Sequence, residues 1–175
     1  QSYTDEGSPG RDWNVATGMV IEGKAGFQIM GDWAKGEFTA AGKTPGVDYY
    51  CAATPSNNGY LYNVDSFIFY KSSDPDKQAG QKLLAKLMMG KNFQKVFNLY
   101  KGSIPARLDV SMDEFDKCAK TSNADIKTAG AKGGLVPSFA HGMAQGNTMK
   151  AALQDIITEH FNSDMSSVDA ANALA

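Results

Sequence analysis

Apolar side chains recur at helical spacing in three stretches of the chain. Residues 147–162 give the clearest pattern, because their apolar positions keep the 3.6-residue period of an amphipathic helix. Residues 76–90 show the same period after a capping Ser or Asp placed before Pro75, and Gly90 ends that helix. Residues 91–102 form the third stretch. The apolar stripes of the last two are Leu83, Leu84, Leu87 and Met88, followed by Phe93, Val96, Phe97 and Tyr100.

Other segments give weaker helical signals. Ser111 and Glu114 match the capping box, in which each residue satisfies a backbone N–H of the other, so a helix is expected to open there. Three more segments are expected to be helical: residues 11–24, Asn123–Thr128 and a last helix that starts at Ser166 or Ser167.

Strand-like stretches are rich in aromatic and β-branched residues. Residues 25–33 predict a strand that runs into a turn, with Asp32 as the cap of the next helix. Residues 47–55 and 59–71 predict two more strands, separated by a turn at 56–59. Glycine-rich or proline-containing loops are expected at 40–46, 102–107 and 130–146. The mixture of helices and strands favours an α/β or α+β fold.

The stretch GYLYNVDSFIFYK holds a polar pair inside an otherwise hydrophobic strand. Asn63 and Asp65 are two residues apart, so on a strand they point to the same face. A solvated edge of a sheet would explain them simply. Alternatively they face partners, since a buried carboxylate needs them. Lys101 and His141 are the candidates.

Each candidate also has an ordinary structural explanation. Lys101 suits the end of a helix, His141 would be satisfied within its loop, and Trp33 would lie in a core. Taken with Asn63 and Asp65, however, they make a set suited to a sugar. Its hydroxyls both donate and accept hydrogen bonds, and its apolar face packs on aromatic rings. The residues alone leave open whether the five side chains converge.

Composition excludes several classes of protein. The 175 residues carry a net charge of −2, with Lys and Arg scattered along the chain, so nothing indicates nucleic-acid or membrane-surface binding. No apolar run reaches the length of a membrane helix, and no signal peptide is visible. The chain starts at Gln1 without an initiator Met, which suggests a processed or cut chain. Phosphate-binding, hydrolase-elbow and zinc-ligand spacings are all missing, so no cofactor or metal is expected.

Cys51 and Cys118 are the two cysteines of the sequence. Their number is compatible with one disulfide or with two buried free thiols. They lack the C-x-x-C spacing of thiol-redox proteins.

Several motifs occur together in a characteristic order: GKAGFQIMGDWAKGEF, NVDSFIFYK, SDPDKQAGQKLLAKLM, KGSIPAR and SFAHG. In this order they resemble the C-terminal part of the extracellular solute-binding proteins of sugar ABC importers. This group includes the maltose-binding type, and the chain is most similar to the periplasmic glucose-binding proteins of Gram-negative bacteria. The resemblance covers essentially the whole chain.

The resemblance implies a two-lobed α/β protein that closes on its ligand. Residues 1–57 would belong to the second lobe, 58–108 to the first and 109–175 again to the second. Sugar hydroxyls would be bound by residues at matching positions: Asn63, Asp65, Lys101, His141 and, with a looser match, Trp33. It also implies a periplasmic location and a Cys51–Cys118 disulfide.

Members of that family are more than twice as long as this chain. The chain therefore resembles a C-terminal piece, expected to be stable only with the missing N-terminal half as a second chain. The function implied is non-enzymatic binding of a hexose, glucose by the closest likeness, and its delivery to a membrane ABC permease. Three alternatives stay open: a binding protein for another mono- or disaccharide, a carbohydrate-active enzyme using Asp65 with a second carboxylate, and a structural fragment without a ligand.

Overall fold

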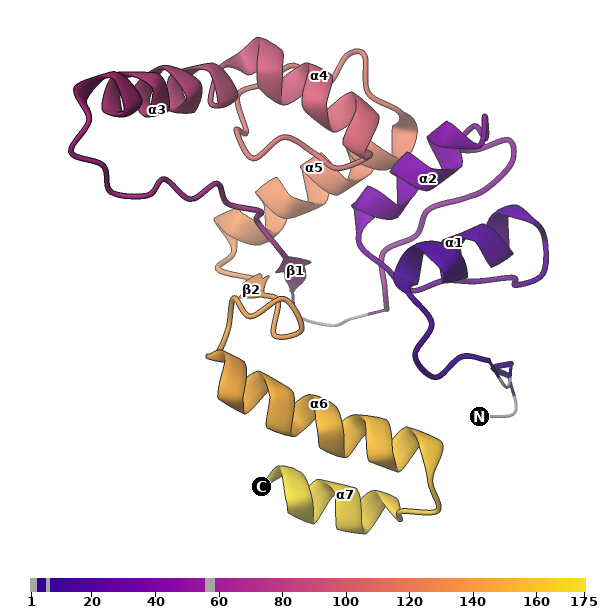
Figure 1. Cartoon of the computed structure of the whole chain (residues 1–175). Helices are drawn as coiled ribbons and strands as arrows, with labels where there is room; N and C mark the ends of the chain where they lie inside the picture. Colours follow the sequence, from indigo (N-terminus) through magenta and orange to yellow (C-terminus); the bar gives the residue numbers. More distant parts are fainter. Residues whose placement is uncertain (1–2, 6, 56–58) are drawn as a thin grey trace.

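A computed structural model describes residues 3–5, 7–55 and 59–175, in which helices surround a very small sheet (Figure 1). Most of the predicted turn at 56–59 and the predicted lobe boundary at 57–58 lie outside the described residues. The elements, in order, are α1 (Trp13–Ile21), the 3₁₀ turn η1 (Asp32–Ala34), α2 (Lys35–Ala40), β1 (Tyr60–Tyr62), α3 (Pro75–Met88), α4 (Lys91–Lys101), α5 (Lys117–Ala131), β2 (Leu135–Pro137), α6 (Asn147–Asn162) and α7 (Ser167–Leu174).

The strongly periodic helices are confirmed. Helix α3 starts where expected, because Asp74 caps it by accepting hydrogen bonds from the backbone N–H groups of Asp76 and Lys77. Helix α6 has the predicted bounds. Helix α7 starts after Ser166, whose side chain accepts from the Asp169 N–H. Helix α1 is shorter than the predicted 11–24 at both ends.

The predicted capping box at Ser111 and Glu114 is wrong. Ser111 donates to the Asp113 carboxylate, while Glu114 forms an ion pair with Lys95. Helix α5 begins at Lys117 instead, where the Asp116 carboxylate accepts from the Ala119 N–H. Asp116, and not Ser111, is therefore the residue that caps the helix. The predicted helix at 123–128 is the middle of α5.

The three long strands are also wrong, because an extended segment becomes a strand only beside a partner. Of residues 59–71 only Tyr60–Tyr62 are paired, in parallel with β2. Residues 25–33 and 47–55 contain no ladder within the described parts of the chain. Strand β2 was missed because its three residues lie in the glycine-rich stretch predicted as loop. The chain still mixes helices with a parallel sheet, as the α/β class predicts.

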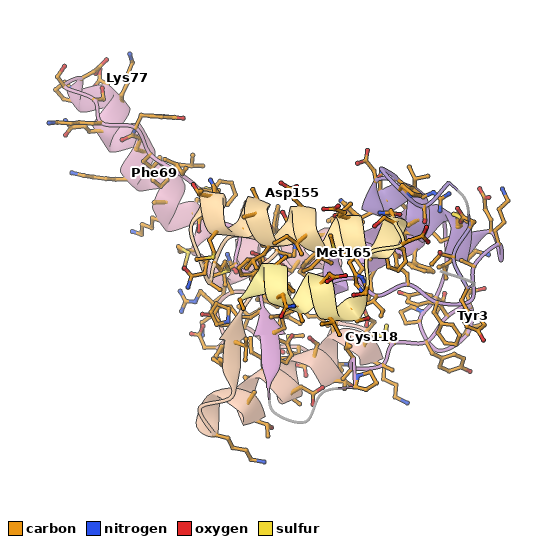
Figure 2. The ribbon with its side chains drawn as sticks, turned by 90° about the horizontal axis from the view of Figure 1, so that it is seen from below. Tyr3, Phe69, Lys77, Cys118, Asp155 and Met165 are labelled. Carbon is orange, nitrogen blue, oxygen red and sulfur yellow. A yellow bond between two sulfur atoms is a disulfide. The ribbon has the colours of Figure 1, made fainter. Side chains whose placement is uncertain are left out.

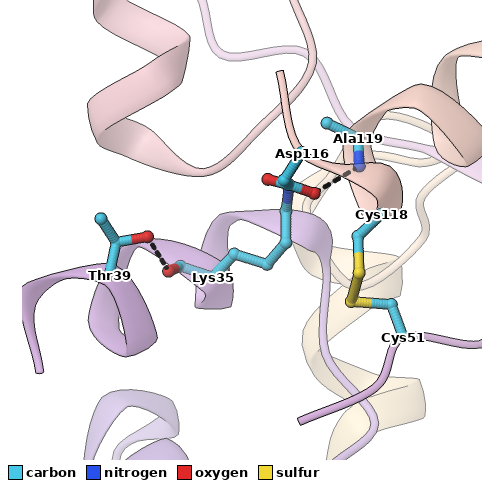
Figure 3. The surroundings of a disulfide bond; sticks show 6 residues. All are labelled: Lys35, Thr39, Cys51, Asp116, Cys118 and Ala119. Atoms are coloured by element: carbon cyan, nitrogen blue, oxygen red, sulfur yellow. Dashed lines mark hydrogen bonds and ion pairs between the residues drawn. A yellow bond between two sulfur atoms is a disulfide. The ribbon is translucent and has the colours of Figure 1, made fainter. Parts of the chain in front are cut away.

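A buried ion pair joins α2 to the residue that caps α5 (Figure 3). Lys35 is only 5% exposed, and its ammonium donates to the Asp116 carboxylate at 2.7 Å. Burial alone would raise the pKa of Asp116, but the hydrogen bonds from Lys35 and the Ala119 N–H outweigh it and lower that pKa. The carboxylate therefore stays ionised beside the buried ammonium.

A disulfide joins Cys51 to Cys118 next to this ion pair, as the resemblance implied. The two cysteines are 67 residues apart in sequence, and closing a loop of that size stabilises a fold by about 4 kcal/mol on the chain-entropy model. The bond ties the segment after α2 to the first turn of α5. It therefore joins the two regions predicted to share the second lobe.

Elsewhere large apolar side chains lie in solvent. Phe67 is 60% exposed, Ile68 77% and Leu83 70%. These side chains follow one another along two adjacent segments, unlike the single exposed apolar residues that are normal on a protein surface. Helix α3 and the segment around Phe69 extend away from the other helices (Figures 1 and 2). Of the apolar stripe of α3 only Met88 is buried among the described residues, whereas Leu84 and Leu87 are 47% and 60% exposed.

Candidate ligand-binding site

A cavity of about 690 Å³ lies where η1, α2, the end of α4 and the loops after β1 and β2 meet. Its volume is within the range of small-molecule sites. All five predicted ligand-binding residues line it, together with five others. The lining consists of Trp33, Asn63, Asp65, Lys101 and His141 with Trp13, Met30, Gly36, Glu37 and Tyr100.

The polar pair Asn63 and Asp65 contacts its predicted cation, Lys101. The Lys101 ammonium donates to one oxygen of Asp65, and the Asn63 amide lies 3.4 Å from the other. The hydrogen bond from Lys101 holds the pKa of Asp65 below its usual range. Asp65 is thus ionised at neutral pH. Its side chain is 63% exposed, so it is a paired carboxylate at an open site, not the buried group considered from the sequence.

His141 is fixed from two sides. The Ser138 hydroxyl lies 2.7 Å from Nδ1, and Ser138 itself is 2% exposed. The ring also meets Trp33 edge to face, with centroids 5.2 Å apart and planes at 84°. Since Ser138 occupies Nδ1, Nε2 is the ring nitrogen left for a ligand. Trp33 and His141, which are far apart in sequence, are thus in contact at the cavity.

The end of α4 is held against α2 by direct backbone contact. A Cβ on Gly36 would lie 2.8 Å from the Lys101 carbonyl oxygen, and one on Gly102 would lie 2.5 Å from the Gly36 nitrogen. Gly102 also has φ of 88°, a left-handed conformation that closes the helix and costs other residues energy. Only glycine at both positions allows this approach, which brings Lys101 to the cavity.

Asp32 reinforces the same contact. The helix cap expected of Asp32 is not formed; its carboxylate accepts from the Ile104 N–H at 3.0 Å across the junction. Burial raises the pKa of Asp32, opposed by that N–H and by the positive charge of Lys35. The GDW turn and the loop after α4 are therefore joined by a hydrogen bond to a half-buried carboxyl group. This places Trp33, the next residue, on the cavity wall.

Sequence reasoning missed the other five lining residues. Tyr100 was interpreted as an apolar helix position and Trp13 lay in a predicted helix, yet they are 80% and 40% exposed. For Tyr100 the sequence did contain a signal of a place near the site, because Tyr100 directly precedes Lys101 at the end of an amphipathic helix. Glu37, the second cavity carboxylate, lies in a helix whose face no periodic pattern defined.

Two kinds of site find no support in the described residues. No group of three or more His, Cys, Asp or Glu side chains among them could hold a metal ion. None of their helices is long and apolar enough to cross a membrane.

Comparison with known proteins decides the family. Residues 1–151 match the bacterial extracellular solute-binding proteins. The chain belongs to this family. Its members are binding proteins rather than enzymes, and membership together with relatives named as periplasmic assigns the chain to the periplasm.

Individual relatives agree with this assignment. A protein of Brucella suis named a probable sugar-binding periplasmic protein is 47% identical over 99% of the chain, which covers 41% of that protein. One of the same name from Rhizobium meliloti is 44% identical over 99% of the chain and 42% of its own length. A xylose/arabinose-binding protein of Haloferax volcanii is 28% identical over 82% of the chain and 31% of its own length. The chain thus spans about two fifths of the first two relatives.

Substitution of glycine tests the close contact at the end of α4. Gly102→Ala should destabilise the protein by more than 2 kcal/mol, because it adds a clash with α2 to the cost of about 1–2 kcal/mol for a left-handed alanine. Gly133→Ala is the matched control, since Gly133 has φ of 69° but open space around it. Denaturant unfolding of both variants, each made in the full-length protein, measures the difference. Equal losses of stability would contradict the contact.

Proposed function

We propose that this chain supplies one wall of a sugar site in the periplasmic binding component of an ABC importer. The proposed ligand is a hexose, with glucose as the leading candidate. The observation that carries the proposal is the convergence of the five predicted side chains on one cavity. They come from four separate segments, so neighbourhood in sequence does not explain the meeting.

The chemistry of the lining suits a pyranose. Asp65 accepts from hydroxyl groups, Lys101 donates to them, and the Asn63 amide offers both a donor and an acceptor. The indole of Trp33 provides an apolar surface for the C–H face of the ring. A sugar would bridge Asp65 and Lys101, whose ion pair is already formed without it.

Another sugar is the second candidate. The Haloferax relative is named for xylose and arabinose, which are pentoses, so the family includes ligands without the sixth carbon of a hexose. Binding of a pentose would use the same polar groups and leave part of the cavity unfilled. A disaccharide would extend toward Trp13 and Tyr100, which line the same cavity.

Transport would follow from closure of two lobes. In this proposal residues 1–57 and 109–175 belong to one lobe and 58–108 to the other, so the cavity receives Trp33 and His141 from the first set and Asp65 and Lys101 from the second. A ligand that contacts both sets binds the closed state more tightly and shifts the equilibrium toward it. The membrane permease would then receive the closed, loaded form.

Calorimetric titration of the full-length protein with a panel of sugars tests the function. Glucose should bind, and Asp65→Ala should weaken binding by about 10- to 100-fold, because it removes an acceptor and leaves the Lys101 charge unpaired. Asp164→Ala, at an exposed carboxylate between α6 and α7, is the control and should bind normally. Heat from a pentose or disaccharide but not from glucose would overturn the hexose assignment. Equal affinity of the Asp65 variant and the parent would overturn the site.

A missing N-terminal half is the proposed partner for the exposed apolar segments, because the chain spans only about two fifths of its relatives. Segment 64–70 and the outer face of α3 are hydrophobic and uncovered, so we propose that the N-terminal half covers them, in the same or a second chain.

Separate expression tests this partner. Residues 1–175 alone should bind a hydrophobic dye, self-associate and unfold without a cooperative transition, whereas co-expression with the N-terminal half should restore cooperative unfolding. The comparison uses light scattering and thermal unfolding. A monomeric fragment with a cooperative transition of its own would contradict the proposal.

A further inference from the structure

The β1–β2 ladder stops abruptly beside the candidate site. Its parallel register pairs Tyr60 with Leu135 and Tyr62 with Pro137. The backbone hydrogen bonds follow that register up to the Ser138 N–H, which donates to the Tyr62 carbonyl at 2.8 Å. In a parallel ladder the next bond would run from the Val64 N–H to the Ser138 carbonyl. That bond is not formed.

Met143 forms hydrogen bonds with both of the backbone groups that would otherwise be unpaired where the ladder stops. Its backbone N–H donates to the Ser138 carbonyl at 3.0 Å. Its thioether sulfur accepts from the Val64 N–H at 3.2 Å. One residue therefore satisfies the donor on one chain segment and the acceptor on the other. The two segments can separate at this point without leaving either backbone group unpaired.

The position of this substitution matters, because the segments carry the ligand-binding residues just beyond it. Val64 lies between Asn63 and Asp65, and Met143 lies two residues after His141. If the ladder continued, the second segment would stay extended beside Val64. The turn from Ser138 to Met143 instead folds back, and His141 on that turn reaches Trp33 and the cavity.

We propose that Met143 is a positioning residue for the ligand site, a role that rests on the proposed function. It ends the ladder and ties the Asn63–Asp65 segment to the His141 loop through its sulfur. Met143 is not among the residues that line the cavity, so it acts through its neighbours. A thioether suits this task, because its long, flexible side chain reaches across the gap and its sulfur is a weak acceptor.

Two substitutions separate the acceptor from the bulk of the side chain. Met143→Leu keeps an apolar side chain of similar volume but offers no acceptor, whereas Met143→Gln keeps an unbranched side chain with a carbonyl oxygen near the position of the sulfur. Met149→Leu, at an exposed methionine of α6, is the control for loss of a thioether. Each variant is made in the full-length protein.

Two measurements are made on each variant: the affinity for the sugar that the parent protein binds best, and hydrogen exchange of the Val64 amide. We expect Met143→Leu to bind about three- to tenfold more weakly and its Val64 amide to exchange faster, since a modest hydrogen bond is lost. Met143→Gln should restore both, and Met149→Leu should change neither.

Parent-like affinity and Val64 exchange in Met143→Leu would overturn the inference. So would equal weakening in the Leu and Gln variants, because that result assigns the effect to side-chain shape instead of the acceptor. A parent protein that binds no sugar counts against the proposed function alone. In that case Val64 exchange still decides the inference: faster exchange in Met143→Leu, reversed in Met143→Gln, supports the tie, and unchanged exchange overturns it.

Discussion

The candidate site depends on one close contact, where the backbone of α2 at Gly36 meets the end of α4 at Gly102. No side chain separates the two segments, because a Cβ at either glycine would collide with the other backbone. Gly102 can end α4 there because it adopts a left-handed conformation. The Asp32 carboxylate then receives the Ile104 N–H across the junction. Lys101 and Trp33 reach the same cavity because their backbones are fixed on the two sides of this contact.

Other restraints bring the remaining side chains to the cavity. The disulfide and the Lys35–Asp116 ion pair hold α2 against the start of α5. Helix α5 leads directly into β2, and the parallel pairing of β2 with β1 brings the segments that carry Asp65 and His141 together. Most of this framework is covalent or backbone bonding. The long polar side chains that would meet a ligand lie at its open edge.

The sequence predicted features that depend on local chemistry. Helices α3 and α6 have strong periodicity, and Asp74 caps the first of them as expected. Ser111 failed as a cap because Asp113 and Lys95 engaged its motif, while Asp116 formed the actual cap. The long strands failed for a different reason. Segments such as 63–71 have strand composition, but pairing requires a neighbour that these residues do not supply.

In the candidate site, too, the residues marked by local sequence were predicted, and those that depend on how distant segments meet were not. Asn63 and Asp65 stand out because polar residues interrupt an apolar run, and the family motifs suggested Lys101, His141 and Trp33. Trp13, Glu37 and Tyr100 line the cavity because of how the helices meet, a relation that helical periodicity does not contain. The role inferred for Met143 likewise depends on register. A methionine in a glycine-rich loop gives no signal until the ladder beside it is known.

A crystal structure of the full-length protein with glucose bound tests the central claim most directly. The account predicts that the sugar lies in this cavity, with hydroxyl groups within hydrogen-bond distance of Asp65, Lys101 and His141 and one face of its ring against an aromatic side chain. A sugar bound elsewhere, with these three side chains more than 5 Å from it, would contradict the account.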